Sequence, residues 1–175
     1  MPHVDIFITC AGEDHGTVMN TIEAACAMDY PADRFRVIVL DDAGSDDLAD
    51  SVSKLSRERP NCVYTARVKP KDHHFKAGNL NYGMDFAKSL PGGPADFIVA
   101  LDADMIPDPQ MLRALLPHIL QDEKVAIVQS PQVCLIRDGR VPLQVMLTAL
   151  SASMTCHQMT LYCRGSTSTL RSQSL

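Results

Sequence analysis

The hydrophobic pattern of residues 1–132 alternates between short apolar runs and longer stretches of helical periodicity. Continuous or alternating apolar runs predict strands at residues 4–9, 36–40, 62–68, 97–101 and 124–129. Between them, apolar side chains recur three or four positions apart and predict helices over residues 16–28, 47–59, 76–90 and 107–116. Strands that alternate with helices favour an α/β fold, in which a mostly parallel sheet carries helices on both faces.

Acidic residues directly follow two of the predicted strands. Asp41 and Asp42 come after the second strand, and Asp102 and Asp104 come after the fourth. Lys76 begins the helix that lies between them in the sequence. The carboxyl ends of parallel strands meet at one edge of a sheet, where open α/β sheets bind ligands. We therefore expect these charged groups to share one site.

This combination of charges suits a metal-bound diphosphate. Two acids that share a turn repel each other unless a cation joins them, and Mg²⁺ prefers one or two protein carboxylates together with phosphate oxygens. Lys76 and the amino end of its helix favour an anion, and Gly78 lets the backbone approach it closely. Simpler interpretations stay open, namely a solvated acidic turn, an Asx-type turn at Asp41, a surface lysine and helix capping by Asn79.

The composition narrows the class of protein. A chain of 175 residues, 46% hydrophobic and 21% charged, is long enough for one globular domain with its own core. A net charge of -5 gives no basic surface for nucleic acid, so we expect no nucleic-acid partner. The six cysteines form no C-x-x-C pair, and the opening residues carry no signal peptide. Both features favour reduced thiols in the cytoplasm.

The pattern changes after residue 132. Residues 133–175 form an atypical tail, which we predict to be partly helical and then disordered from the Ser/Thr/Arg-rich stretch at Gly165 onward. Residues 141–163 contain no charged side chain, but several polar ones interrupt the stretch. An interfacial helix is favoured over a membrane span, so a cytoplasmic chain and one peripherally associated with a membrane or a membrane partner both stay open.

Five short motifs occur in order along the chain. They are Val-Asp-Ile-Phe-Ile-Thr-Cys (4–10), Leu-Asp-Asp-Ala-Gly-Ser-Asp-Asp (40–47), His-Phe-Lys-Ala-Gly-Asn-Leu-Asn-Tyr-Gly (74–83), Leu-Asp-Ala-Asp (101–104) and Val-Gln-Ser-Pro-Gln (128–132). Together they resemble the processive family 2 glycosyltransferases, in particular the cellulose-synthase-like group and its fungal members. The resemblance covers about residues 3–132 and makes residues 1–132 the nucleotide-sugar-binding half of a GT-A domain.

The resemblance implies a UDP-sugar donor, Mg²⁺ or Mn²⁺, and inverting transfer to a polysaccharide or another glycan acceptor. Asp42 or its neighbour Asp41 would contact the uridine. Lys76, with Gly78 and Asn79 in the same motif, would hold the nucleotide and its diphosphate. Asp102 would contact the ribose and the metal-bound diphosphate, and Asp104 would be the direct metal ligand. In the family this chemistry takes place at the cytoplasmic face of a membrane.

The sequence departs from the family in two motifs. It lacks the Thr-Glu-Asp motif that supplies the general base, and without tryptophan it cannot contain Gln-x-x-Arg-Trp. The catalytic base is therefore unknown, and the domain is expected to be incomplete at its C-terminal side. Two hypotheses follow, a metal-dependent glycosyltransferase and a truncated, non-catalytic remnant that binds a nucleotide sugar. The Lys-Ala-Gly-Asn-Leu-Asn motif disfavours an Asp-x-Asp phosphatase, and the adjacent His73 and His74 are typical of a solvated loop.

Overall fold

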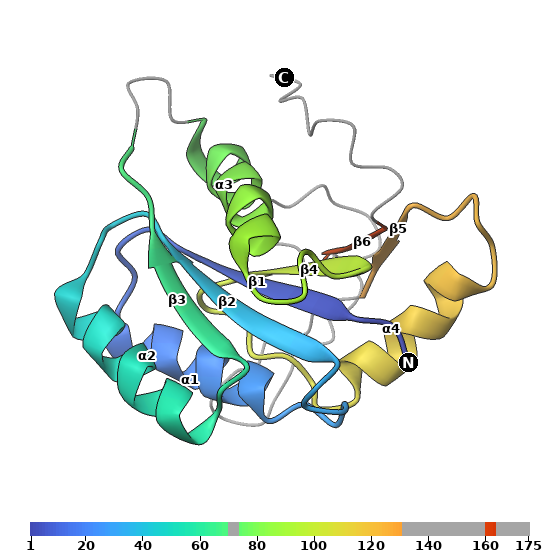
Figure 1. Ribbon diagram of the computed structural model, residues 1–175, viewed down its shortest axis with the longest axis horizontal. Helices are drawn as coiled ribbons and strands as arrows, with labels where there is room; N and C mark the ends of the chain where they lie inside the picture. The colour runs from blue at the N-terminus through green and yellow to red at the C-terminus, as the bar shows by residue number, and fades with distance from the viewer. Residues whose placement is uncertain (70–73, 131–159, 164–175) are drawn as a thin grey trace, which may run out of the picture.

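Strands and helices alternate along the chain in the order that the hydrophobic pattern predicts. The computed structural model describes residues 1–69, 74–130 and 160–163 (Figure 1). Its elements are β1 (Val4–Cys10), α1 (His15–Cys26), β2 (Phe35–Asp41), α2 (Asp46–Glu58), β3 (Cys62–Ala66), α3 (Phe75–Ser89), β4 (Phe97–Asp102), α4 (Met111–Leu120), β5 (Ile127–Gln129) and β6 (Thr160–Cys163).

The strands form one sheet in the order β3-β2-β1-β4-β6-β5. Strands β3, β2, β1 and β4 are parallel, and β6 is antiparallel to both of its neighbours. The register places Cys10 beside Asp41 and Thr9 beside Asp102. The predicted mostly parallel α/β sheet is thus confirmed, and the ends of its two acid-bearing strands flank the end of β1.

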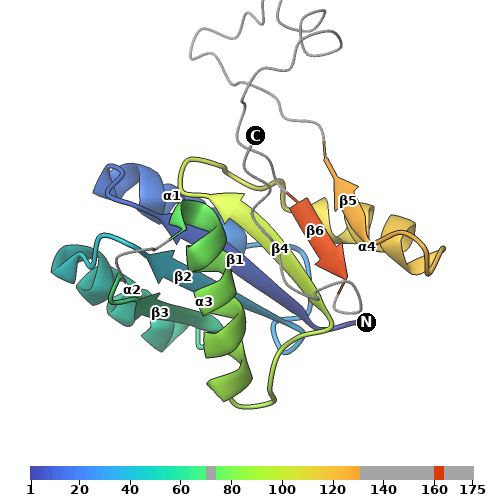
Figure 2. The same ribbon diagram turned by 90° about the horizontal axis from the view of Figure 1, so that it is seen from above.

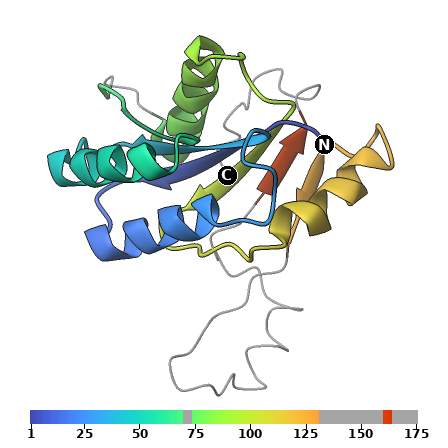
Figure 3. The same cartoon turned by 60° about the horizontal axis from the view of Figure 1, so that its bottom comes forward.

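Helices cover both faces of this sheet, as predicted. Figures 1 and 3 show α3 on one face and α1, α2 and α4 on the other. Alternate residues of each strand supply the two cores, so that Ile6 and Ile8 join the three-helix face while Phe7 faces α3. All three side chains are fully buried, which is the reason for the unbroken apolar runs in the sequence.

Helix α3 packs closely against strands β2 and β3. A Cβ atom placed on Gly83 would come within 2.6 Å of Leu40 Cδ1. The Asn79 Nδ2 atom donates to the carbonyl of Leu40 at 2.9 Å, and the Tyr82 and Thr65 hydroxyls are 2.8 Å apart. These contacts hold the amino end of α3 over the carboxyl ends of the central strands.

A buried ion pair lies at the amino ends of β1 and β2, at the edge of the sheet opposite the carboxyl ends of the strands. Asp5 is almost fully buried and accepts two hydrogen bonds from the Arg36 guanidinium, at 2.8 and 2.9 Å. Arg36 also donates to the carbonyl of Gly93, and Asp5 accepts from the amide of Ala95. The loop that returns the chain from α3 to β4 is therefore fastened to β1 and β2.

The predicted boundaries need four corrections. The helix predicted over 107–116 instead runs from Met111 to Leu120, because Asp108 holds residues 108–111 in a hydrogen-bonded turn. The third strand ends at Ala66 instead of residue 68, because Arg67 turns inward to an ion pair and leaves Val68 97% exposed. The fifth strand begins only at Ile127, because Asp122 holds residues 122–125 in a hydrogen-bonded turn.

The fourth correction concerns the interfacial helix predicted over residues 141–163. Its last residues, 160–163, instead form strand β6, which pairs with β4 and β5 (Figure 2). The backbone hydrogen bonds of two neighbouring strands are available at that position, and this long-range pairing decides the local structure. The remainder of that prediction, and the predicted disorder from residue 165, lie outside the described residues.

Two further predictions concern thiols and membranes. Cys10, Cys26 and Cys62 are free and buried, as expected for reduced thiols, whereas the other three cysteine side chains lie outside the part that is described. Within the described part of the chain, every helix is too short or too polar to cross a lipid bilayer.

Candidate nucleotide-binding site

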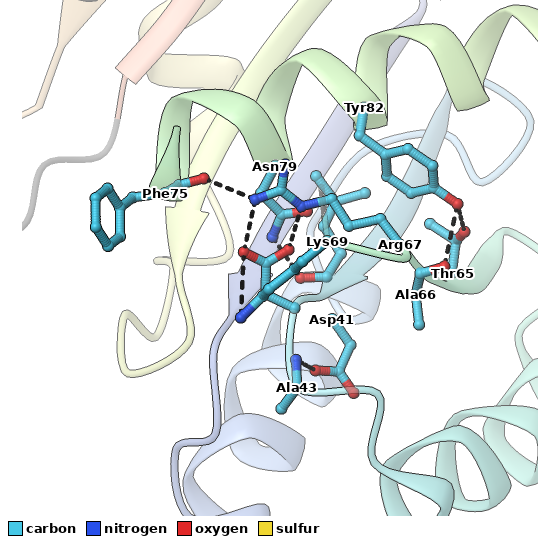
Figure 4. Close-up of polar contacts among 11 residues, drawn as sticks. Asp41, Ala43, Thr65, Ala66, Arg67, Lys69, Phe75, Asn79 and Tyr82 are labelled. Atoms are coloured by element: carbon cyan, nitrogen blue, oxygen red, sulfur yellow. Dashed lines mark hydrogen bonds and ion pairs between the residues drawn. The ribbon is translucent and has the colours of Figure 1, made fainter. Parts of the chain in front are cut away.

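The charged residues that the sequence analysis selected lie at the carboxyl edge of the sheet. Strand β2 ends at Asp41 and is followed by Asp42, strand β4 ends with Asp102, and α3 begins nearby with Phe75 and Lys76. Figure 4 shows the part of this edge between β2, β3 and the start of α3. Parallel pairing to the shared neighbour β1 is what brings residues 60 positions apart to the same edge.

Asp41 organises the turn that follows β2. Its carboxylate accepts hydrogen bonds from the amides of Ala43 at 2.7 Å and Ser45 at 2.8 Å, and from the Tyr64 hydroxyl at 2.8 Å. Burial and the hydrogen bond to Asp41 raise the pKa of Tyr64, so this hydroxyl keeps its proton and remains a donor. Asp41 is thus the centre of the Asx-type turn that was one of its two predicted roles.

Asp42 forms a buried ion pair with Arg67. Arg67 Nε donates to Asp42 Oδ1 at 2.5 Å and Arg67 Nη2 to Asp42 Oδ2 at 2.9 Å, and the two side chains are only 6% and 7% exposed. This bidentate contact raises the pKa of Arg67. Lys69 Nζ lies 3.9 Å from the same carboxylate. The end of β2 therefore presents a carboxylate whose position is held by two cations.

Arg67 also contacts the start of helix α3. Its Nη2 atom donates to the carbonyl of Phe75 at 3.0 Å (Figure 4). His74 and Phe75 have φ angles of 50° and 45°, in the left-handed region that non-glycine residues rarely adopt. The chain thus enters α3 through a strained turn that Arg67 and the contacts of Asn79 hold in place.

Sequence reasoning missed Arg67 and Lys69 as members of the site. Arg67 lies within the alternating pattern that predicts a strand, and Lys69 lies in a polar loop. Their position in the sequence was a usable signal, because both follow the carboxyl end of β3. Strand β3 is the direct neighbour of β2, so a basic side chain at this position lies near the acid at the end of β2.

Lys76 and Asp102 meet, as the sequence predicts. The Lys76 ammonium donates to Asp102 Oδ1, and the Thr9 hydroxyl at the end of β1 donates to the same oxygen at 3.3 Å. The Asp102 side chain is 8% exposed, whereas that of Lys76 is 43% exposed. The carboxylate is therefore fixed in the protein, and the ammonium lies at the boundary with solvent.

Asp104 occupies an exposed position in the loop after β4. The Thr21 hydroxyl on α1 donates to the carbonyl of Ala103 at 2.8 Å, and the Met105 amide donates to the carbonyl of Asp102 at 3.1 Å. These bonds fix the backbone on both sides of Asp104, whose carboxylate has no hydrogen bond or ion pair to the described residues. Asp104 thus projects from an ordered turn two residues beyond Asp102.

The first turn of α3 holds the other two predicted residues. Gly78 is half-buried, and its amide donates to the carbonyl of His74 at 3.0 Å inside the helix. Asn79 is buried, and its Oδ1 atom has no hydrogen-bond partner among the described residues. Its amide orientation is set by the carbonyl of Leu40, which requires the NH₂ group on that side. The Asn79 oxygen is therefore an unused acceptor close to the site.

The donor atoms of this edge fit a hard divalent cation that shares its ligands with phosphate. Asp102 and Asp104 offer carboxylate oxygens, the ligand type that Mg²⁺ and Mn²⁺ prefer. Among the described residues no group of three or more His, Cys, Asp or Glu side chains is placed to bind a metal. His74 belongs to no such group, and His73 lies outside the described residues. A cation held here would need further oxygens, such as those of a diphosphate.

Comparison with known proteins assigns the chain to a family. Residues 2–170 match the family described as glycosyltransferase like family 2. The chain belongs to this family. The family match runs past residue 132, where the motifs recognised in the sequence end.

Cellulose synthases are among the relatives of this chain. The cellulose synthase catalytic subunit [UDP-forming] of Pseudomonas fluorescens is 37% identical over 130 residues, which are 74% of this chain and 16% of the relative. Cellulose synthase 1 of Komagataeibacter xylinus is 30% identical over 130 residues, or 8% of its length. The predicted cellulose-synthase-like affiliation is confirmed, and the chain spans only a small part of these relatives.

Solved structures confirm the predicted GT-A-like fold. Mannosyltransferase PcManGT of Pyrobaculum calidifontis, in complex with GDP-Man and Mn²⁺, has a TM-score of 0.66 at 19% identity, over 94% of this chain and 45% of its own. TarS 1–349 of S. aureus, in complex with UDP, has a TM-score of 0.51 at 16% identity, over 68% of this chain and 32% of its own. At these identities the likeness concerns the fold alone.

Proposed function

We propose that this chain binds a UDP-sugar together with Mg²⁺ or Mn²⁺ and belongs to an inverting glycosyltransferase that acts on a polysaccharide or another glycan. One observation carries the proposal, namely that one sheet edge joins the Lys76–Asp102 pair and the Asp42–Arg67 pair through the start of α3. The printed names of the relatives support it, since one cellulose synthase is called UDP-forming and two structural neighbours contain GDP-Man with Mn²⁺ or UDP.

The nucleoside would lie at the end of β2. Asp42 offers a carboxylate to a base N–H or a ribose hydroxyl, and the two hydrogen bonds from Arg67 hold that carboxylate in position. Asp41 acts behind it by holding the turn. The unused Asn79 oxygen is a further acceptor at the start of α3. This end of the site is polar and preorganised, as recognition of a base or ribose requires.

The diphosphate would lie between α3 and the end of β4. Lys76 and the amino end of α3, with Gly78 in its first turn, attract phosphate oxygens. Asp102 would face the ribose and the metal-bound diphosphate, and Asp104 would be the direct metal ligand. The exposed carboxylate of Asp104, on a turn fixed by Thr21, is suited to a cation that arrives from solvent with its own phosphate ligands.

Transfer with inversion follows from attack by an acceptor hydroxyl on the anomeric carbon, opposite the departing UDP. The bound cation supplies electrostatic stabilisation of the negative charge on the leaving diphosphate. Lys76 adds a second positive charge at the same phosphates. The acceptor hydroxyl must lose a proton to a general base, a role that we assign to no residue of this chain.

A second candidate is a nucleotide-sugar-binding unit without transfer activity of its own. The observation in its favour is that these 175 residues contain neither the Thr-Glu-Asp motif nor a tryptophan. Both candidates share the donor site. They differ in turnover, since the glycosyltransferase releases UDP from a UDP-sugar in the presence of an acceptor and the binding unit does not.

Calorimetric titration with UDP tests the shared donor site. We expect binding that depends on Mn²⁺ and is lost in Asp104→Ala, because that substitution removes the metal ligand and leaves the turn intact. Asp33→Ala is the matched control, since Asp33 is exposed at the opposite edge of the sheet. Binding of UDP that is independent of metal, or equal loss in both variants, would contradict the role of Asp104. UDP-sugar turnover by the same preparation then separates the two candidates.

A further inference from the structure

The Lys76 ammonium pairs with Asp102, the carboxylate that in the proposed donor site would face the metal-bound diphosphate. It donates to Asp102 Oδ1, an oxygen that also accepts from the Thr9 hydroxyl. Asp102 is buried and held by the sheet, whereas Lys76 is partly exposed on a flexible four-carbon chain. In this pair the carboxylate is the fixed partner and the ammonium is the mobile one.

An ammonium at this position works against a metal ion that arrives alone. A divalent cation near Asp102 would lie close to the positive charge of Lys76, and like charges in a partly desolvated site repel strongly. The described residues offer no third carboxylate, histidine or cysteine in a group with Asp102 and Asp104 to offset this cost. A diphosphate changes the balance, because its oxygens are ligands for the cation and partners for the ammonium.

We propose that Lys76 is a displaceable counter-cation of Asp102, which makes metal binding by this chain conditional on a nucleoside diphosphate. The inference rests on the proposed donor site. When the diphosphate enters, Lys76 leaves Asp102 for a phosphate oxygen and the carboxylate becomes accessible to the cation. The ammonium thus has two roles of opposite sign, because it weakens the binding of metal alone and strengthens the binding of diphosphate.

Thermodynamic linkage gives this inference a measurable form. If UDP raises the affinity for Mn²⁺ by some factor, Mn²⁺ must raise the affinity for UDP by the same factor. Removing the Lys76 charge should raise the affinity for Mn²⁺ alone and lower the affinity for UDP. Because a residue that merely attracts phosphate affects UDP only, Mn²⁺ binding in the absence of nucleotide is the decisive readout.

The experiment measures Mn²⁺ binding to the full chain by electron paramagnetic resonance of the free ion, with and without saturating UDP. Lys76→Met removes the charge without adding a metal ligand, and Lys76→Ala repeats the test with a shorter side chain. Lys88→Met is the matched control, since Lys88 pairs with Asp85 at the far end of the same helix. Circular dichroism confirms that each variant is folded. A constant ionic strength keeps the screening of charges equal in all samples.

We expect Lys76→Met to bind Mn²⁺ alone about tenfold more tightly than the wild type, in the usual range of coupling between sites. We expect UDP to bind it more weakly, and Lys88→Met to behave as the wild type. Adding Asp102→Asn to Lys76→Met should remove the gain, which assigns it to this carboxylate. Unchanged or weaker binding of Mn²⁺ alone by both Lys76 variants would overturn the inference.

The outcomes also separate this inference from the proposed function. If the wild type binds UDP with Mn²⁺ but the Lys76 variants gain no affinity for Mn²⁺ alone, the donor site stands and the counter-cation role fails. If no protein binds UDP, the proposed donor site fails, and so does the dependence of metal binding on nucleotide. A gain in Mn²⁺ affinity by Lys76→Met would then report only repulsion between two cations.

Discussion

Replacing Arg67 with methionine removes one half of the ion pair at the end of β2. Asp42 and Arg67 are both nearly buried and make two hydrogen bonds to each other. Breaking a buried pair from one side costs about 3–5 kcal/mol, because it leaves an uncompensated charge in the protein. Lys69 remains 3.9 Å from the Asp42 carboxylate and supplies part of the lost charge. We therefore expect the lower end, about 3 kcal/mol of the free energy of unfolding.

Thermal and urea unfolding measure this loss directly. For a chain of this length, 3 kcal/mol corresponds to a fall of roughly 6–12 °C in Tm. The double variant Asp42→Asn, Arg67→Met should be more stable than Arg67→Met, because it no longer buries a lone carboxylate. A Tm within about 1 °C of the wild type for Arg67→Met would refute the reasoning, because it would correspond to a loss of about 0.5 kcal/mol or less.

Arg36→Met is the matched control for the function of this ion pair. It breaks the corresponding pair with buried Asp5 at the opposite edge of the sheet. Both variants should lose stability, but only Arg67→Met should lose UDP affinity at a temperature where both proteins are folded. Equal loss of UDP affinity in the two variants would show that Arg67 acts through general stability alone.

Two further predictions concern the core and a buried thiol. Gly83→Ala should lower the free energy of unfolding by about 1 kcal/mol, because the clash of its Cβ with buried Leu40 outweighs the helix propensity gained; a more stable variant in urea unfolding would contradict this. Burial, with the charges of Glu13 and Asp41, raises the pKa of Cys10 from 9.0 to about 12. Folding therefore favours the protonated thiol. The free energy of unfolding should fall as the pH rises from 9.0 to about 12, and it should fall less steeply in Cys10→Ala. Urea unfolding at several pH values measures both slopes, and identical slopes would exclude the assignment.

The sheet was predictable from the sequence because its central strands are buried on both faces. Continuous apolar runs such as 97–101 indicate this burial, and two of them, 36–40 and 97–101, are followed directly by the acids that mark the carboxyl edge. Strand β6 was not predictable, because its four residues pair with strands that are distant in the sequence. Local pattern carries no information on such a partner.

The acidic residues of the candidate site could be predicted from the sequence, whereas only some of its basic residues could. Asp42, Asp102 and Lys76 stand at element ends, where topology alone brings them to one edge. The alternating pattern around Arg67 predicts an ordinary strand residue. Its side chain turns inward because Asp42, at the end of the neighbouring strand, carries the opposite charge. The role of Asp41 in its own turn could be named only as one of two alternatives, because both roles use the same residue type.

The central claim is that the ends of β2 and β4 and the start of α3 surround one cation-bound nucleoside diphosphate. Paramagnetic broadening of amide signals by Mn²⁺ in the presence of UDP tests this claim most directly. We predict strong broadening at Ala43, Ala103 and Gly78, and none at Gly93 on the opposite edge. Broadening centred on Gly93, or spread evenly over both edges, would contradict the account.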